Sequence, residues 1–200
     1  MPDAIDFYFD LSSPYAYLAS ERIEALAAGH GRRVRWRPYL MGAVYRVNGM
    51  RPLTDIPLIN EYSRFDIERC ARQHGIPLQM PAEFPYAAIA GSRAFYWLDD
   101  RDPGLARDLA HALLRRYFGA GQPVATAEQV AEVGGTLGLA REELLAALQS
   151  QAVKDRLRAE TEAAIARGVF GSPYFFIDDQ PFFGNDRLEQ MDEWLRRGGW

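Results

Sequence analysis

The sequence predicts an α/β protein in which a small mixed sheet is built from the two ends of the chain and helices fill the middle. Two observations predict this class. Runs of apolar residues typical of strands occur only near the start and near the end, whereas residues 41–168 place apolar side chains at helical spacing. The predicted order is therefore βαβ, a helical block and then ββα, and we expect an inserted all-α segment over a compact α/β unit.

The first three elements follow directly from the N-terminal pattern. Residues 5–9 alternate in the period of two that predicts a strand. A helix is expected from Pro14, because proline fits the first helical position, and its apolar spacing runs on to Gly29. Residues 33–40 place apolar side chains between arginines and predict a second strand, parallel to the first because a helix connects the two.

The middle of the chain carries only helical signals, separated by glycine and proline. Apolar faces predict helices around residues 67–74, 105–113, 130–137 and 153–165. Thr126 with Gln129 forms a capping-box pattern at the start of the third of these helices. Gly168 ends the fourth.

Strand signals return at the C-terminal end. The run SPYFFID predicts one strand, Asp178 and Asp179 a turn, and PFF a second strand. A last helix is expected in NDRLEQMDEWLRR, with Asn185 or Asp186 as its N-cap. We therefore expect a discontinuous α/β domain made of residues 1–40 and 169–200, and an inserted helical domain made of residues 41–168.

Composition excludes several classes of function. The 200 residues are 48% hydrophobic and 25% charged, with a net charge of -4, which gives no electrostatic footprint for nucleic acid. No apolar run is long enough to span a membrane, and MPDAIDFYF lacks the pattern of a signal peptide, so we expect a cytoplasmic protein. Cys70 is the only cysteine and the histidines are far apart, so neither an intramolecular disulfide nor a metal site is expected.

Three short features are candidates for a site. In DLSSPYAYLA, Ser12 or Ser13 is expected to cap the helix, and a helix N-terminus can equally hold an anion, so both interpretations stay open. In GSPYFF, Pro173 marks a strand start, an edge or a cis turn, and Ser172 before it can pair with an extended ligand. In FFGNDR, free N–H groups and Asp186 can hold a small zwitterion, although an ordinary capped helix is the simpler interpretation.

Taken together, these motifs resemble a known family over essentially the whole chain. DFYFDLSSPYAYLA, FDIERCARQHGIPLQMP and VFGSPYFFI with PFFGNDRLE are similar to the 2-hydroxychromene-2-carboxylate isomerases and kappa-class glutathione transferases. These belong to the DsbA-like superfamily, and the resemblance implies a thioredoxin-like fold with an inserted all-α helical domain. The dithiol relatives open their helix with a Cys-Pro-His-Cys type motif, where this chain has Ser13-Pro14-Tyr15-Ala16.

The loss of both motif cysteines makes dithiol exchange unavailable. The resemblance implies instead that glutathione is the cofactor and that Ser13 is the catalytic residue, supporting the glutathione thiolate by a hydrogen bond at the positive end of the helix. It also implies the remaining residues of the glutathione site, which are Ser172, Pro173, Phe183, Gly184, Asn185 and Asp186.

For the activity, the resemblance implies an isomerase of aromatic catabolism. Reversible addition of the thiolate would convert the small-molecule substrate 2-hydroxychromene-2-carboxylate to trans-o-hydroxybenzylidenepyruvate. The alternatives are a kappa-class-like glutathione transferase or peroxidase and, without catalysis, a module that binds peptides along the Pro173 edge. Homodimers are usual among such relatives, so a homodimer is expected here.

The chain departs from the family pattern near the expected substrate loop, LMGAVYRVNGMRP. Tyr45 stands where we expect a lysine, and Met50 follows the glycine where an asparagine is usual. Asn48 is the candidate replacement, so Tyr45 and Asn48 are the predicted substrate residues. Relatives also often carry a lysine three residues before Tyr62, where this chain has Ile59. These departures leave the exact substrate open.

Overall fold

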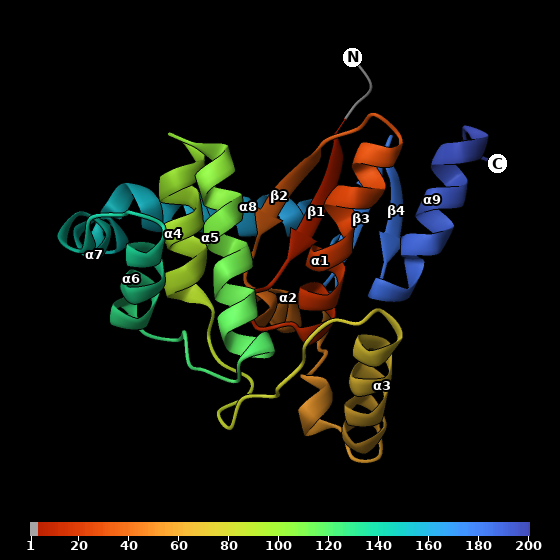
Figure 1. Ribbon diagram of the computed structural model, residues 1–200, viewed down its shortest axis with the longest axis horizontal. Helices are drawn as coiled ribbons and strands as arrows, with labels where there is room; N and C mark the ends of the chain where they lie inside the picture. The colour runs from red at the N-terminus through yellow and green to blue at the C-terminus, as the bar shows by residue number, and fades with distance from the viewer. Residues whose placement is uncertain (1–3) are drawn as a thin grey trace.

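A computed structural model describes residues 4–200 of the chain. Residues 1–3, the start of the N-terminal stretch for which no signal peptide is expected, lie outside the described residues. The described chain forms a four-stranded sheet with helices on both of its faces (Figure 1). The strands are β1 (Ile5–Phe9), β2 (Val34–Pro38), β3 (Tyr174–Ile177) and β4 (Gln180–Phe183).

The sheet joins the two ends of the chain in the order β2-β1-β3-β4. The pair β1 and β2 is parallel, as predicted, with Phe7 opposite Trp36. Strand β3 is antiparallel to both β1 and β4, and it places Phe175 on the other side of Phe7. The prediction of an α/β fold with βαβ and ββα ends is confirmed.

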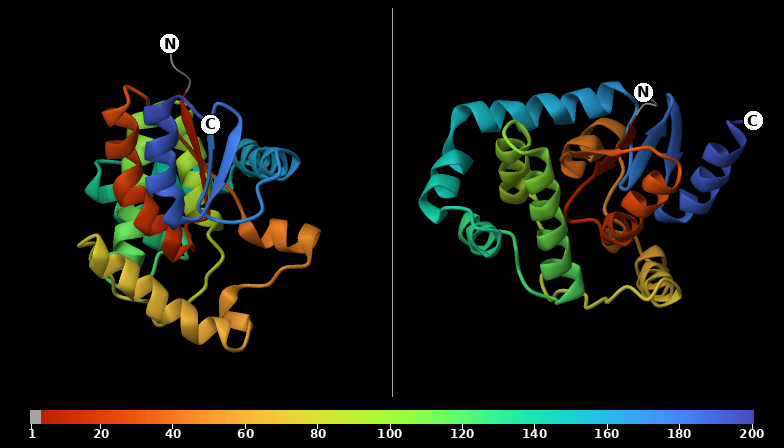
Figure 2. Two further views of the ribbon diagram at one scale, coloured as in Figure 1. Left: turned by 90° about the vertical axis from the view of Figure 1, so that its right-hand side faces the viewer. Right: turned by 45° about the horizontal axis from the view of Figure 1, so that its top comes forward.

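Both faces of the sheet are covered, so all five residues of β1 are buried. Ile5, Phe7 and Phe9 pack into a large cluster on the side of α1 (Pro14–Gly29). On the opposite face, Tyr8 joins a smaller cluster with residues from α8 (Gln151–Ala166). Figure 2 shows the sheet with α1 and α9 on one side and α8 on the other. A side chain that points away from the main core therefore still lies in the interior.

The chain between β2 and β3 is helical, as predicted. Two short 3-10 turns, η1 and η3, and one π-helical segment, η2, accompany the helices. The elements not yet given are α2 (Met41–Asn48), η1 (Leu53–Asp55), α3 (Ile59–Gln73), α4 (Ile89–Asp99), α5 (Pro103–Leu114), η2 (Arg115–Gly119), α6 (Ala127–Thr136), α7 (Arg141–Gln149), η3 (Asn185–Arg187) and α9 (Leu188–Arg197). The division into residues 1–40 with 169–200 and residues 41–168 stays a prediction, since one buried cluster runs through both parts.

Helix ends show where local sequence signals succeed and fail. The capping box of Thr126 and Gln129 at α6 is confirmed, with both hydrogen bonds formed. The prediction that Asn185 or Asp186 caps the last helix is wrong. Those residues form the 3-10 turn η3 after Gly184, whose φ is 110°, and α9 begins only at Leu188. Asn185 is buried in this turn, and the N-cap of α9 is Arg187, with no side-chain capping hydrogen bond.

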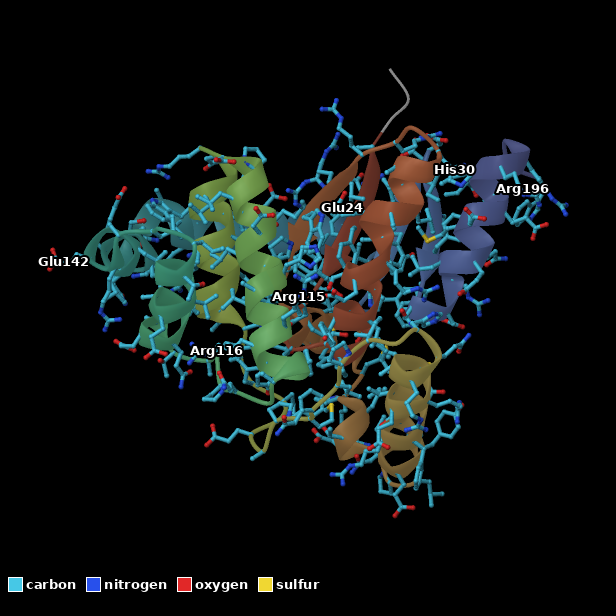
Figure 3. All side chains as sticks on the ribbon, viewed as in Figure 1. Glu24, His30, Arg115, Arg116, Glu142 and Arg196 are labelled. Atoms are coloured by element: carbon cyan, nitrogen blue, oxygen red, sulfur yellow. The ribbon has the colours of Figure 1, made fainter. Side chains whose placement is uncertain are left out.

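Ion pairs hold the outer layer of helices to α1. Arg115, the first residue of η2 and labelled in Figure 3, donates to Glu21 of α1 at 2.7 Å. Burial raises the pKa of Glu21, but the partners His111 and Arg115 outweigh it and lower that pKa to about 2.

Among the described residues, no helix is both long and apolar enough to cross a lipid bilayer.

Candidate functional site

The turn between β1 and α1 is built around the cap of α1. Ser13 has an extended backbone, and its Oγ accepts a hydrogen bond from the N–H of Ala16 at 3.2 Å. Pro14 occupies the first helical position, where no N–H is needed. The prediction that one of the two serines caps the helix is confirmed, and the serine is Ser13. The positive end of the α1 dipole therefore lies at this side chain.

The Ser13 hydroxyl also joins α1 to the segment before β3. Its Oγ donates to the carbonyl oxygen of Ser172 at 3.0 Å, although 159 residues separate the two. The Ser172–Pro173 peptide bond is cis. The Ser172 hydroxyl in turn accepts from the backbone N–H of Asp10 at 2.9 Å. The structure thus brings together two of the three candidate features. The hydroxyl of Ser13 already donates its hydrogen to the Ser172 carbonyl.

The third candidate feature lies directly beside Ser172. Tyr174 pairs with Phe183 across β3 and β4, and the N–H of Gly184 donates to the carbonyl of Pro173 at 3.1 Å. Asn185 is buried, and its Oδ1 has no hydrogen-bond partner. All residues expected at a glutathione site therefore gather around the N-terminus of α1 and the start of β3.

Two aromatic rings form the outer edge of this group. Phe183 is 44% exposed and its ring lies 4.7 Å from that of Phe170, measured between centroids. The Phe183 ring also lies against Gly171, where an added Cβ would come within 2.2 Å of it. The absence of a side chain at Gly171 thus leaves room for the Phe183 ring to pack against this part of the backbone. The Asp186 side chain is exposed and lies 3.4 Å from Arg187.

Asp10 is a central residue of the turn that sequence analysis did not single out. It is 4% exposed, and its Oδ1 accepts from the N–H and the hydroxyl of Ser12 at 2.8 and 2.7 Å. Its Oδ2 accepts from the N–H of Met41, the first residue of α2, at 2.7 Å. Burial raises the pKa of Asp10 above its ordinary value, and the hydrogen bonds from Met41 and Ser12 oppose this only in part.

A carboxyl at the end of an apolar strand, two residues before Ser12, was the available signal for Asp10. The hydrogen bonds show that this carboxyl sets the position of both the Ser12–Ser13 turn and the N-terminus of α2. It receives them from neutral groups, two backbone N–H groups and one hydroxyl.

Helix α3 contacts the first turn of α1 through Tyr15, a contact that the sequence analysis did not indicate. The Tyr15 hydroxyl donates to Asp66 Oδ2 at 2.7 Å, and Asp66 forms an ion pair with Arg69. Burial and the Asp66 carboxylate raise the pKa of Tyr15 well above its ordinary value, so the hydroxyl stays protonated as a donor. Cys70 Sγ lies 4.0 Å from Asp66 Oδ2, and burial raises the pKa of this thiol.

The two predicted substrate residues lie on α2 and in its C-terminal turn. Tyr45 is half-buried, and its pKa is raised by burial and then by the charges of Asp10 and Asp55. Asn48 is exposed, and its Oδ1 accepts from the N–H of Met50 at 3.0 Å. Among residues 4–200, no hydrogen bond joins Tyr45 or Asn48 to Ser13. Their role in substrate binding stays a prediction.

Among the described residues, no group of three or more His, Cys, Asp or Glu side chains converges that could hold a metal ion. The N-terminus of α1 stabilises negative charge, and the segments at Ser172 and Gly184 carry backbone groups that can pair with a ligand. No second cysteine accompanies Cys70, so the site cannot form a disulfide within the chain.

Comparison with known proteins agrees with this geometry. Residues 4–196 match the model of the DsbA-like thioredoxin domain. A glutathione S-transferase kappa 2 of Caenorhabditis elegans is 32% identical, over 96% of this chain and 91% of that protein. A 2-hydroxychromene-2-carboxylate isomerase of Pseudomonas putida is 31% identical, over 96% of this chain and 94% of that protein.

A solved structure gives the same result in three dimensions. The structure of a 2-hydroxychromene-2-carboxylate isomerase superposes with a TM-score of 0.88 at 30% identity, covering 97% of this chain and 95% of that one. The fold, the family model and the relatives agree over nearly the full length. This chain belongs to the family of DsbA-like thioredoxin-fold proteins that includes the 2-hydroxychromene-2-carboxylate isomerases and the kappa-class glutathione transferases.

Proposed function

We propose that this chain is a glutathione-dependent isomerase that converts 2-hydroxychromene-2-carboxylate, or a related acid of aromatic catabolism, to trans-o-hydroxybenzylidenepyruvate. The observation that carries the proposal is the position of Ser13. It caps α1 where the dithiol relatives carry their first cysteine, and it contacts the Ser172 carbonyl before Pro173. Since Cys70 lies outside this motif, on α3, the nucleophile has to come from a ligand.

The residues present fit glutathione. The Oδ1 atom of Asn185 is a buried acceptor without a partner, which a ligand ammonium or amide would satisfy. Ser13 and the N-terminus of α1 would hold the thiolate, Ser172 and Pro173 the peptide part. The γ-glutamyl end would lie at Phe183, Gly184, Asn185 and Asp186. When bound, glutathione supplies a thiolate that adds reversibly to the unsaturated acid and is regenerated.

The Ser13 hydroxyl has to change partner for this role, because it donates to the Ser172 carbonyl. That carbonyl is an acceptor for the amide N–H of an extended ligand. A thiolate is a stronger acceptor than a neutral carbonyl, so the Ser13 hydroxyl would turn to the thiolate while a ligand N–H donates to the carbonyl in its place. The Ala16 N–H still donates to Ser13 Oγ and keeps it at the helix end. Binding and activation are thereby linked at one hydrogen bond.

Calorimetric titration with glutathione tests the common premise. We expect saturable binding that Ser13→Ala weakens and Ser13→Thr, which keeps the hydroxyl, largely retains. Saturable binding that is identical in the wild type and Ser13→Ala would contradict the role of Ser13. Absence of binding to the wild-type protein would leave the non-catalytic peptide-binding module as the better interpretation.

A kappa-class-like transferase or peroxidase is the second candidate, supported by the 32% identity to the Caenorhabditis elegans relative. The two activities differ in what happens to glutathione. An isomerase returns it, so product forms from 2-hydroxychromene-2-carboxylate without loss of free thiol. A transferase consumes one thiol per product, and it would act on a chlorodinitrobenzene-type acceptor. Thiol consumption in proportion to product would defeat the isomerase proposal.

A homodimer and a cytoplasmic location belong to the same proposal. Support for the dimer comes from the family, in which homodimers are usual. Support for the location comes from the single cysteine of the chain, which cannot form an intramolecular disulfide. Light scattering of the purified protein measures the oligomeric state directly, and a monomer at all concentrations would contradict the dimer.

A further inference from the structure

Helix α2 begins without a cap from its own sequence. Its N-cap residue is Leu40, which forms no side-chain capping hydrogen bond. The first N–H groups of a helix have no partner inside the helix and need one from elsewhere. Asp10 provides it from 31 positions away in the chain, because its Oδ2 accepts from the N–H of Met41 at 2.7 Å. The Asp10 carboxylate therefore takes the place of a local capping side chain at α2.

The same residue holds the turn that positions Ser13. The N–H of Ser13 donates to the backbone carbonyl of Asp10 at 2.9 Å. The Oδ1 atom of Asp10 accepts from the N–H and the hydroxyl of Ser12, and the N–H of Asp10 donates to Ser172 Oγ. Every polar atom of Asp10 is thus engaged, and its hydrogen bonds reach the start of α1, the start of α2 and the segment before β3.

The start of α2 has few other attachments. Val44 is the only residue of this helix that is buried. The N–H of Leu40 donates to Thr161 Oγ1, but at the longer distance of 3.3 Å. Tyr45 is half-buried and Asn48 is exposed, so the predicted substrate residues lie on a weakly held helix. The position of α2 relative to the Ser13 turn therefore depends strongly on the Asp10 carboxylate.

Burial makes the hydrogen bonds of Asp10 depend on one another. Asp10 is 4% exposed, so water cannot readily replace a donor that moves away. A buried carboxylate oxygen left without its donor costs more free energy than an ordinary hydrogen bond contributes. A displacement of α2 is therefore expected to turn the carboxylate, and with it the Ser12–Ser13 turn, rather than to leave Oδ2 unpaired.

We propose that Asp10 is a positioning residue that couples α2 to Ser13. A substrate that contacts Tyr45 or Asn48 would hold α2 in place, and Asp10 would pass that order on to the hydroxyl of Ser13. This role rests on the proposed function, because it requires Ser13 to support a glutathione thiolate. Asp10 acts on turnover without contacting the reacting atoms, since its side-chain oxygens are already engaged.

Met41→Pro tests the coupling, because it removes the donor to Asp10 Oδ2 and leaves Asp10 unchanged. Proline fits the first helical position, and Leu40 before it already has the extended backbone that proline favours. Met41→Ala is the matched control, since it also shortens the side chain but keeps the N–H. Amide hydrogen exchange is followed by NMR at Ala16, whose N–H donates to Ser13 Oγ. We expect this exchange to speed up about tenfold in Met41→Pro and to change less than about twofold in Met41→Ala.

Kinetics show whether the reaction uses the coupling. With 2-hydroxychromene-2-carboxylate as substrate, Met41→Pro is expected to lower kcat about tenfold relative to Met41→Ala. The KM for glutathione should stay within about twofold, because Ser172 and Asn185 are not altered. A raised KM with unchanged kcat would overturn the positioning role, because a structural disturbance of binding would then explain the effect.

Asp10→Asn approaches the coupling from the α1 side, and it carries the test if circular dichroism shows that Met41→Pro does not fold. The asparagine keeps the size of Asp10 but offers one acceptor atom where the carboxylate offers two. Exchange is expected to speed up both at Ala16 and at Ala43, whose N–H donates to the Leu40 carbonyl at 3.0 Å. Acceleration at only one of the two amides would overturn the coupling.

The outcomes separate the coupling from the proposed function. No acceleration at Ala16 in Met41→Pro, or equal acceleration in Met41→Ala, would overturn the coupling even if glutathione binds. The expected exchange pattern in a protein that does not bind glutathione would instead overturn the proposed function and leave the coupling standing.

Discussion

Asp6 in β1 and Asp10, the residue directly after this strand, are four residues apart and have opposite kinds of hydrogen-bond partner. Both are buried, at 6% and 4% exposure. Asp6 is surrounded by cations, with Arg37 Nε at 3.0 Å and Arg167 Nη1 at 2.5 Å. Asp10 is bound only by neutral donors from Ser12 and Met41. A strand can thus carry a structural ion cluster at one end and a carboxyl of the candidate site at the other.

The pKa values follow from the partners. Burial raises the pKa of Asp6, but the hydrogen bonds and charges of Arg167, Arg37 and Arg35 outweigh it, so that pKa lies below its ordinary value. Burial dominates at Asp10, whose pKa lies above it. Arginine partners stabilise the ionised form far more than N–H and O–H groups do. The same residue type therefore has its ionised form favoured by arginines at Asp6 and disfavoured by burial at Asp10.

The largest effect on stability is expected from Asp6→Asn. This variant removes the buried carboxylate that Arg37 and Arg167 share, leaving them only Glu160 and Asp179 respectively. We expect the free energy of unfolding to fall by about 2 to 3 kcal/mol. Urea unfolding measures it. Arg35→Gln, which removes the most exposed of the three partners, is the control and should cost less than about 0.5 kcal/mol. Equal losses of stability in Asp6→Asn and Arg35→Gln would contradict the view that the buried carboxylate contributes more than its exposed partner.

Asp10→Asn is expected to cost about 1 kcal/mol at neutral pH. The asparagine carbonyl can accept from Ser12 or from Met41 but not from both, and its NH2 group then faces another donor. Urea unfolding again gives the stability. A loss as large as that of Asp6→Asn would show that Asp10 is equally a part of the folded core, and would weaken the assignment of Asp10 to the site.

The pH dependence should separate the two residues by sign. The pKa of folded Asp6 is below its ordinary value of 3.8, so its stabilisation is lost as the pH falls below that value. The pKa of folded Asp10 is raised, so the unfolded chain releases this proton first and stability falls as the pH rises above 3.8.

Unfolding free energies of the wild type, Asp6→Asn and Asp10→Asn across about pH 3 to pH 6 measure both trends. The advantage of the wild type over Asp6→Asn should shrink toward acid, and its advantage over Asp10→Asn should shrink as the pH rises. Changes in the same direction would contradict the opposite pKa shifts.

Cys70→Ser should have the smallest effect, within about 0.5 kcal/mol of stability. The cysteine is half-buried beside Asp66, and a serine keeps its size. Since the proposed reaction takes its thiol from glutathione, turnover should also be unchanged. Loss of activity in Cys70→Ser with normal folding would mean that the chain supplies its own thiol.

Much of this arrangement could be predicted from the sequence because its signals are local. Pro14 at the first helical position, the alternation in residues 5–9 and the Thr126 capping box each depend on neighbours within one turn. The error at Asn185 arose where the helix starts with a 3-10 turn, which has no comparable signature.

What could not be predicted depends on distant partners. Asp10 directly follows β1, and the groups that bind it from a distance are Met41 at the start of α2 and Ser172 before β3, which lies 162 positions away. The contact of Tyr15 with Asp66 joins residues 51 positions apart, and it depends on the orientation of α3.

The most direct test of the account is the pKa of the glutathione thiol when bound. Its thiolate absorbs in the ultraviolet, so titration of the complex gives the value. A free thiol has a pKa of about 8.5, and the wild-type complex is expected to titrate well below it, with the pKa rising by about one unit or more in Ser13→Ala. A bound thiol that titrates identically in the wild type and Ser13→Ala would contradict the central claim that Ser13, at the N-terminus of α1, supports the thiolate.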